Sequence, residues 1–254
     1  MTVHVDVDAY LKRIGFTEVP KVDLVTLTNL QRAHLTSVPF ENLDVVAGIA
    51  VRTDLEWSLD KVVERQRGGW CFELNGAFSA LLEALGFDVK LLGAAVLLDG
   101  PNQQIDHLAL EVTLDQPYLV DVGFGESFIV PLELNRSGAQ DGGSGTYEFI
   151  GSSQGLTLTM HDTSGLPVAR YRFKRVNRTL SDFTPASERL QSDRGLHWSA
   201  KPFATRLIEG GPDRITLLKD RLKTVVDGRE TETAVDEADW ADVLRSEFSM
   251  AVII

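Results

Sequence analysis

Residues 67–75 read Arg67-Gly68-Gly69-Trp70-Cys71-Phe72-Glu73-Leu74-Asn75 and contain the only cysteine of the 254-residue chain. Cys71 therefore has no disulfide partner within the chain. Apolar residues follow it with the spacing of one helix face, at Leu74, Phe78, Leu81, Leu82 and Leu85, before Gly86, a residue type common just after helix ends. A thiol in the first turn of a helix lies at the positive end of the helix dipole, which favours the thiolate. The stretch predicts a helix that begins with a nucleophilic cysteine.

Two later residues have the character of partners for this thiol. His107 begins the strand-like run 107–113, and Asp121 follows the apolar run 118–120 and precedes a glycine-rich turn. Cysteine nucleophiles are commonly activated by a histidine whose ring is oriented by a carboxylate. We therefore predict that Cys71, His107 and Asp121 form a catalytic triad.

Each of the three residues also has an ordinary structural interpretation. A lone cysteine is usually a small buried hydrophobic side chain. A histidine at a strand end is often structural, and an aspartate before glycine is common in turns. The joint occurrence of the three residues favours catalysis over these separate explanations.

Four sequence blocks in order carry a resemblance to a known family. They are Val38-Pro39-Phe40-Glu41-Asn42-Leu43-Asp44-Val45, the stretch 67–75, His107-Leu108-Ala109-Leu110 and Asp121-Val122-Gly123-Phe124-Gly125. These blocks resemble the signature blocks of the arylamine N-acetyltransferases. The resemblance is specific over residues 38–125 and becomes general beyond about residue 180.

The resemblance implies an α+β fold in three parts around a Cys-His-Asp core like that of cysteine proteases. The expected parts are an N-terminal helical bundle at 1–86 with the nucleophile, a central antiparallel β-barrel at 87–180 with the histidine and aspartate, and a C-terminal α/β lid at 181–254. Several short strand-like runs between residues 87 and 176 favour a barrel or sandwich independently of the resemblance.

The resemblance also implies a ping-pong acetyl transfer. Cys71 would accept an acetyl group from acetyl-CoA, with His107 as base and proton shuttle and Asp121 as the orienting carboxylate. A small aromatic amine or hydrazine would then attack the thioester. The implied walls of the substrate pocket are Phe40, Val96, Phe124 and Phe203, and Gly125 would lie where the acyl donor approaches.

Two features depart from the family pattern. Asp106 stands directly before His107, where a small hydroxyl residue is expected, and the sequence ends at residues 251–254, soon after Phe248. A carboxylate at position 106 would repel the phosphates of coenzyme A or alter His107. Both features favour an alternative within the family, an amide synthase that joins a polyketide acyl chain to an aryl amine. Its donor would be a thioester on an acyl carrier protein.

Two other classes of protein fit the same residues. A Cys-His-Asp hydrolase would use the same three groups and release its product to water without an amine. A non-catalytic binding protein would leave Cys71 with ordinary reactivity toward iodoacetamide at pH 6.

Composition limits the partners of the chain. The net charge of -12 and the pI near 4.9 argue against nucleic acid or an anionic membrane as the main partner. We expect no membrane span, because no apolar run of about 18 residues occurs, and no signal peptide, because the N-terminus is acidic. A single unpaired cysteine is typical of a reducing compartment, so we expect the cytoplasm. No metal-ligand cluster or nucleotide-binding glycine motif is present.

Capping residues predict the helices at the two ends of the chain. Asp8, Asp23 and Ser58 are expected to cap three helices in the first 86 residues, and Asp236 a final one. We expect 43–54 to be irregular or extended, 40–42 to form a turn, and 137–145 to be an exposed loop. His34 is expected to be a structural residue of the second helix.

Overall fold

The computed structural model describes residues 4–193, 197–209 and 211–251. The first residues of the acidic N-terminus and residues 252–254 of the C-terminus lie outside these ranges. Within them, no helix is long and apolar enough to cross a membrane. No three His, Cys, Asp or Glu side chains in the same ranges lie close enough together to hold a metal ion.

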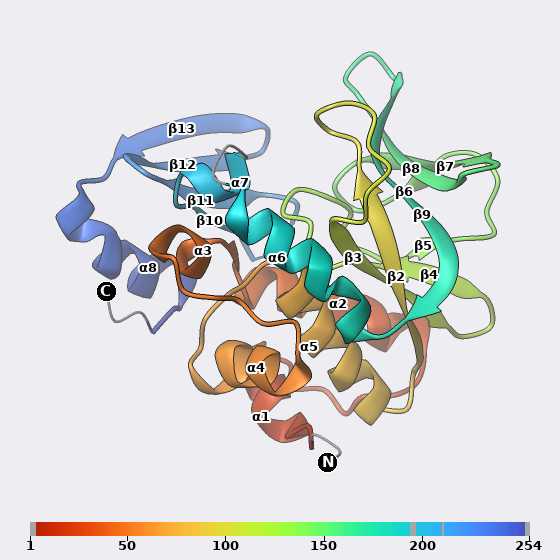
Figure 1. The fold of residues 1–254 in the computed structure, drawn as a ribbon, viewed down its shortest axis with the longest axis horizontal. Helices are drawn as coiled ribbons and strands as arrows, with labels where there is room; N and C mark the ends of the chain where they lie inside the picture. Colours follow the sequence, from red (N-terminus) through yellow and green to blue (C-terminus); the bar gives the residue numbers. More distant parts are fainter. Residues whose placement is uncertain (1–3, 194–196, 210, 252–254) are drawn as a thin grey trace.

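The N-terminal part of the chain is helical, and one helix lies at its centre. The elements are α1 (Val7–Arg13), α2 (Leu24–Ser37), α3 (Leu43–Ala47), α4 (Leu55–Leu59), the π-helical turn η1 (Asp60–Glu64) and α5 (Cys71–Ala84). All residues of α5 from Cys71 to Leu82 are buried. The other helices surround it on one side and the barrel covers it on the other (Figure 1). The helix with the predicted nucleophile is therefore the core of the bundle.

An eight-stranded antiparallel sheet curls into a nearly closed barrel beside these helices (Figure 1). Its order is β5-β4-β3-β2-β9-β8-β7-β6, with bounds β2 (Asp88–Val96), β3 (His107–Thr113), β4 (Pro117–Val120), β5 (Leu132–Glu133), β6 (Gln140–Asp141), β7 (Thr146–Ser152), β8 (Gly155–His161) and β9 (Pro167–Arg178). The side chain of Gln140 joins the two end strands, because its Oε1 accepts from Glu133 N at 2.8 Å and its Nε2 donates to Glu133 O at 3.2 Å. The barrel that the resemblance implies is confirmed, and it is one of the two architectures, barrel or sandwich, that the strand pattern favoured.

A second antiparallel sheet contains strands from both ends of the chain. Its order is β1 (Phe40–Glu41), β10 (Ala204–Leu207), β11 (Arg214–Leu218), β12 (Arg221–Val226) and β13 (Arg229–Ala234). The helix α8 (Trp240–Phe248) buries Leu244 and Phe248 against it. The turn η2 (Leu180–Phe183) and the helices α6 (Thr184–Ser192) and α7 (His197–Ala200) connect the barrel to this sheet, and the turn η3 (Glu237–Asp239) precedes α8. The predicted fold class is confirmed; the predicted domain limits at 86 and 180 stay predictions.

Several local predictions were wrong, because contacts with distant residues or a capping residue earlier in the chain determined which elements form and where they begin. Asp6, not Asp8, caps α1, and Asp54, not Ser58, caps α4. Residues 43–47 of the segment expected to be irregular form α3, and residues 140–141 of the expected loop form β6. Asp23 caps α2 as predicted.

The segment 40–42, expected to be a turn, begins with a strand. Phe40 pairs with Thr205, and Glu41 pairs with Ala204. The partner strand β10 lies far along the chain, so the sequence around residues 40–42 alone does not indicate a strand. The β1–β10 pairing joins the helical part of the chain to its C-terminal sheet.

Candidate active site

Two glycines bring β1 against the turn before Cys71. A Cβ atom at Gly68 would collide with the Pro39 carbonyl oxygen, and one at Gly69 would lie 2.7 Å from Glu73 Oε2. Glu41 N donates to Gly69 O at 2.9 Å, so the strand and the turn are held together through backbone. The close approach requires residues without a side chain.

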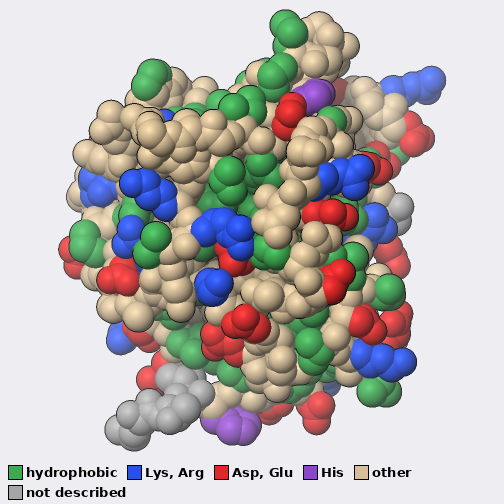
Figure 2. Space-filling model, turned by 90° about the vertical axis from the view of Figure 1, so that its right-hand side faces the viewer, with side chains coloured by type: hydrophobic (Ala, Val, Ile, Leu, Met, Phe, Trp, Pro, Cys, Tyr) green, Lys and Arg blue, Asp and Glu red, His purple; other side chains and the backbone are tan. Residues whose placement is uncertain are grey.

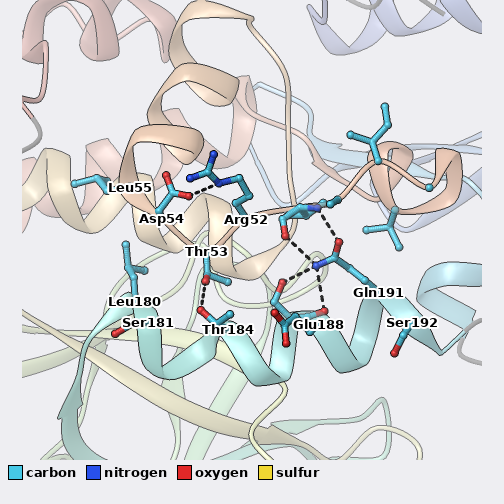
Figure 3. Close-up of a pocket in the computed structure, with 16 residues that line it drawn as sticks. Arg52, Thr53, Asp54, Leu55, Leu180, Ser181, Thr184, Glu188, Gln191 and Ser192 are labelled. Carbon is cyan, nitrogen blue, oxygen red and sulfur yellow. Dashed lines mark hydrogen bonds and ion pairs between the residues drawn. The ribbon is translucent and has the colours of Figure 1, made fainter.

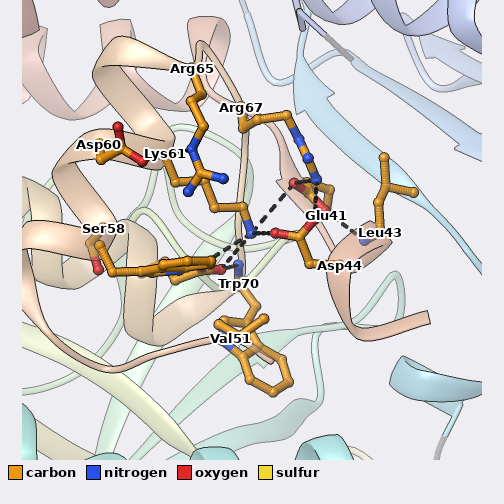
Figure 4. Close-up of polar contacts among 12 residues, drawn as sticks. Glu41, Leu43, Asp44, Val51, Ser58, Asp60, Lys61, Arg65, Arg67 and Trp70 are labelled. Carbon is orange, nitrogen blue, oxygen red and sulfur yellow. Dashed lines mark hydrogen bonds and ion pairs between the residues drawn. The ribbon is translucent and has the colours of Figure 1, made fainter. Parts of the chain in front are cut away.

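A buried charge cluster lies behind the start of α5 (Figure 4). Lys61, which is 1% exposed, places its Nζ 2.8 Å from Asp44 Oδ2 and 3.0 Å from Glu73 Oε1. Arg67 Nη2 lies 2.8 Å from Glu41 Oε1 and 3.0 Å from Asp44 Oδ1. Buried charges of this kind are tolerated when they are paired and hydrogen-bonded.

Glu73 connects the charge cluster to the start of α5, where Cys71 lies. Its Oε2 accepts a hydrogen bond from Trp70 N at 3.1 Å, which caps the helix that starts at Cys71. Its Oε1 accepts from Trp57 Nε1 at 2.8 Å. Burial raises the pKa of Glu73, and the neighbouring Lys61 opposes this effect. The position of the Cys71 backbone therefore depends on charges contributed by three other segments.

The structure brings Cys71, His107 and Asp121 together from α5, β3 and the end of β4. His107 Nε2 lies 2.7 Å from Asp121 Oδ2, and the side chains of Cys71 and His107 line the same cavity. All three residues are buried or nearly so, at 6%, 2% and 1% exposure. This arrangement is the one expected of a thiol nucleophile with a histidine base and an orienting carboxylate.

Asp121 is held by donors on both carboxylate oxygens. Asn75 Nδ2 and Gly123 N donate to Oδ1, each at 2.9 Å. Tyr171 donates its hydroxyl to Oδ2 at 3.1 Å, and its ring lies 5.0 Å from that of His107. Such donors stabilise the charged carboxylate and fix its direction.

The two supporting side chains, Asn75 and Tyr171, differ in how clearly the local sequence marks them. Asn75 lies four residues after Cys71 and therefore on the same helix face, so the helical pattern could have found it. Tyr171 comes from β9, fifty residues after Asp121, and nothing local marks it.

Asp121 outweighs burial in setting the protonation state of His107. Burial lowers the pKa of a histidine, but the charge and hydrogen bond of Asp121, with a smaller contribution from Cys71, raise the pKa of His107 to about 10. The imidazole is therefore protonated at neutral pH.

A narrow cavity of about 50 Å³ exposes the thiol and the imidazole. All four residues predicted to form the pocket line it with Cys71 and His107, and the further lining residues are Asn42, Trp70, Asp106, Gly123 and Leu190. The rings of Phe40 and Phe203 lie 5.5 Å apart, and the ring of Phe124 lies 5.0 Å from that of His107. The walls are apolar and aromatic, which suits a flat apolar group.

Two other predicted positions lie at the edge of this cavity. Gly125 has φ +82°, and a Cβ there would lie 3.4 Å from Phe40 Cδ1. Asp106 places its carbonyl oxygen 3.9 Å from Cys71 Sγ. Its carboxylate accepts from Val96 N at 2.8 Å and from Asn102 Nδ2 at 2.5 Å, so it closes the loop between β2 and β3. Burial raises the pKa of Asp106.

A larger groove, of about 780 Å³, lies away from these groups (Figure 3). It runs between α6 and residues 48–55. Val51 N donates to Gln191 Oε1, Gln191 Nε2 donates to Val51 O, and the hydroxyls of Thr53 and Thr184 are hydrogen-bonded, so these residues are held to α6. Volume alone does not mark the chemical site here, because the thiol, imidazole and carboxylate converge at the smaller cavity.

Comparison with known proteins shows which family has this arrangement. A family model described as N-acetyltransferase matches residues 23–253. The chain is 40% identical over 152 residues to the pineal gland arylamine N-acetyltransferase of Gallus gallus, an alignment that covers 57% of this chain and 52% of the relative. It thus spans about half the length of the first curated relatives that it matches.

Two further comparisons extend over nearly the whole chain. Arylamine N-acetyltransferase 2 of Mus musculus is 29% identical, with 97% of this chain and 94% of the relative covered. The structure of the Mycobacterium marinum arylamine N-acetyltransferase in complex with CoA superposes with a TM-score of 0.87 at 29% identity, over 97% of this chain and 93% of that one. The resemblance predicted from the four sequence blocks is confirmed, and the chain belongs to the N-acetyltransferase family that includes the arylamine N-acetyltransferases.

Proposed function

We propose that this protein transfers an acetyl group from acetyl-CoA, through a thioester on Cys71, to the nitrogen of an arylamine or hydrazine. The observation that carries the proposal is that Cys71 and His107 line one aromatic cavity, where Asp121 Oδ2 lies 2.7 Å from His107 Nε2. The M. marinum relative solved with CoA supports coenzyme A as the donor.

In the first half-reaction the Cys71 thiolate attacks the thioester carbonyl of the donor. The sulfur–carbon bond of Cys71 forms, the bond to the coenzyme A sulfur breaks, and His107 gives its proton to the departing thiolate. The backbone N–H groups of Cys71 and Phe72, the first two residues of α5, point toward its N-terminus, where they suit the oxyanion of the intermediate.

In the second half-reaction the amine attacks the acetyl group on Cys71. His107, now neutral, accepts a proton from the amine nitrogen as the new nitrogen–carbon bond forms and the thiolate leaves. Asp121 keeps the imidazole in one orientation and stabilises its charged form in both steps. The rings of Phe40, Phe124 and Phe203 provide the contact surface for an aromatic acceptor.

The mass of the intact protein tests the proposal. After mixing with acetyl-CoA and no amine, the wild type should gain one acetyl group, whereas Cys71→Ala should gain none. Addition of an arylamine should remove the group from the wild type. A wild type that stays unacetylated while Cys71 reacts quickly with iodoacetamide at pH 6 would contradict acetyl-CoA as the donor.

A second candidate function uses the same residues with another donor. In an amide synthase, Cys71 would accept a polyketide acyl chain from an acyl carrier protein and pass it to an aryl amine. The observation that favours this candidate is Asp106, a half-buried carboxylate at the cavity that disfavours the phosphates of coenzyme A. The cytoplasmic location stays a prediction based on the single unpaired cysteine.

A further inference from the structure

A second groove lies on the outer face of the barrel, between β2 and β9. It has a volume of about 340 Å³. Its lining residues are Gly93, Ala95, Gln103, Ile105, Ser153, Gln154, Arg172, Phe173, Lys174, Val176 and Arg178. It is separate from the cavity at Cys71, because the sheet wall lies between the two.

An irregular pairing of β2 with β9 forms the groove. Leu92 pairs with Asn177 and Ala94 pairs with Phe173, so Gly93 faces the three residues 174–176 of β9. Extra residues in one strand bend it and redirect its side chains. A Cβ at Gly93 would lie 2.8 Å from both Arg178 Nε and Ile105 Cδ1, so glycine keeps the floor of the groove open.

The groove is positively charged although the chain as a whole carries a net charge of -12. Arg172, Lys174 and Arg178 line it, and no Asp or Glu is among its described lining residues. Lys174 forms no ion pair with a residue in the described ranges, whereas the charge of Arg178 contributes to lowering the pKa of the Asp182 carboxyl. By contrast, Arg175 of the same strand is neutralised by Glu111, at 2.6 Å. The charge of Lys174 is therefore available to a partner, while Arg178 shares its charge with Asp182.

Exposed aliphatic side chains lie among these cations. Val176 is 55% exposed and lines the groove, and Ile150 on β7 is 45% exposed. Ile150 pairs with Thr157, which pairs with Arg172, so all three side chains share the outer face of the sheet. Figure 2 shows this side of the molecule, with Lys and Arg side chains next to exposed hydrophobic ones. A mixed basic and aliphatic surface fits a protein better than a nucleic acid, whose backbone offers charge alone.

One loop connects this surface to the active site. Ile105 lines the groove, and the next two residues, Asp106 and His107, line the cavity at Cys71. The loop is held in place because Arg172 Nη2 donates to Asn102 O at 2.7 Å and Arg189 Nη2 donates to Ile105 O at 2.8 Å. A partner in the groove would therefore lie beside the rim of the catalytic cavity.

We propose that the groove docks an acidic acyl carrier protein, which presents its acyl group as a thioester on a flexible arm. The proposal rests on the proposed acylation of Cys71. Acidic side chains of the carrier pair with Lys174 and Arg178, and its aliphatic side chains cover Val176 and Ile150. The Cys71 thiolate then forms a bond to the acyl carbon, the bond to the carrier sulfur breaks, and the proton of His107 passes to the released carrier thiol.

The test measures acylation of Cys71 by intact mass with three donors: an acetylated acyl carrier protein, acetyl-CoA, and the acetyl thioester of N-acetylcysteamine. The variant is Lys174→Glu with Arg178→Glu. The matched control is Lys12→Glu with Arg32→Glu, two exposed cations of the helical side. We expect the variant to lower the rate with the carrier donor about tenfold or more and to flatten its dependence on salt. The rate with the N-acetylcysteamine thioester should stay within about twofold, and the control should change neither rate.

The outcomes separate the docking surface from the chemistry. Equal losses with the carrier and the small thioester would mean a structural defect and overturn the docking proposal. Equal acylation of the variant and the wild type by the carrier donor would also overturn the docking proposal. A wild type that accepted acetyl-CoA and refused the carrier would overturn the docking proposal but leave the proposed acetyl transfer in place. Failure of all three donors on the wild type would overturn the proposed function itself.

Discussion

His34 and His107 are both buried, and both lie against α5, yet their surroundings move their pKa values in opposite directions. His34 packs its ring 5.1 Å from that of Phe78, and its Nε2 lies 3.1 Å from the Tyr10 hydroxyl. Burial, aided by Arg13, lowers the pKa of His34 to about 3. The pKa of His107 is about 10, because Asp121 more than offsets the same burial effect.

The difference shows that burial does not make a histidine reactive. A buried ring beside a hydroxyl stays neutral and serves packing, whereas a buried ring beside a fixed carboxylate keeps its proton. The carboxylate partner at 2.7 Å is thus the feature that separates His107, the proposed base, from the structural histidine His34. The following variants test this conclusion.

Asp121→Asn should have the largest effect. It removes the charge that keeps His107 protonated, and the amide cannot accept from all of the donors around Asp121. We expect the rate of Cys71 acetylation by acetyl-CoA to fall by about 10³ to 10⁴. The nuclear magnetic resonance titration of His107 should move toward the pKa of His34. Asp115→Asn, in the turn before β4, is the control, and an unchanged His107 titration in Asp121→Asn would contradict the account.

The loss of folding stability at acidic pH tests the lowered pKa of His34. Because its pKa is lowered in the folded state, the unfolded chain binds a proton at this site first as the pH falls below about 6.5. The stability that neutral His34 contributes is present above that pH and is lost on acidification toward pH 3. Between pH 7 and pH 5 the wild type should lose about 2 kcal/mol more than His34→Gln in urea unfolding. Equal losses in the two proteins would mean that His34 is protonated in the folded state.

Tyr171→Phe removes one donor from Asp121 and keeps the ring, which lies tilted beside that of His107. Hydrogen bonds to charged groups contribute about 1.5–3 kcal/mol, so we expect the acetylation rate to fall about tenfold or more. Circular dichroism should show that the fold is retained. A variant with wild-type acetylation would show that the other donors suffice to orient the carboxylate.

Tyr10→Phe makes the same chemical change beside His34. The neutral hydrogen bond at 3.1 Å is lost, and the free energy of unfolding should fall by about 1 kcal/mol. Acetylation of Cys71 should not change, because this hydroxyl lies in the helical core. If Tyr10→Phe lowered the acetylation rate as much as Tyr171→Phe does, the distinction between the His34 and His107 sites would be lost.

The local sequence was sufficient to predict the elements that carry the triad. The helix at Cys71, the strand at His107 and the turn after Asp121 each follow from apolar spacing and glycine placement within a few residues. His34 was also interpreted correctly as structural from its place in an amphipathic helix. The family resemblance supplied the three-part architecture that these short patterns do not specify.

The remaining parts depend on contacts between distant residues. The segment 40–42 has no strand pattern of its own and becomes extended only against β10. Ser58 was expected to cap a helix, but Asp54 is a competing cap four residues earlier, and its carboxylate accepts from Trp57 N. The charge cluster around Lys61 joins four segments, so no single stretch of sequence reveals it.

The pairing of β1 with β10 has a consequence for biosynthesis. The nucleophile, the base and the carboxylate all lie in the first half of the chain, but Phe203 and β10 leave the ribosome much later. Domains fold largely in the order in which they are synthesised, so the barrel and bundle can form while one wall of the cavity is still missing. We expect a nascent chain to hold its three reacting groups without a closed pocket, and to become competent for acyl transfer only when its last strands dock.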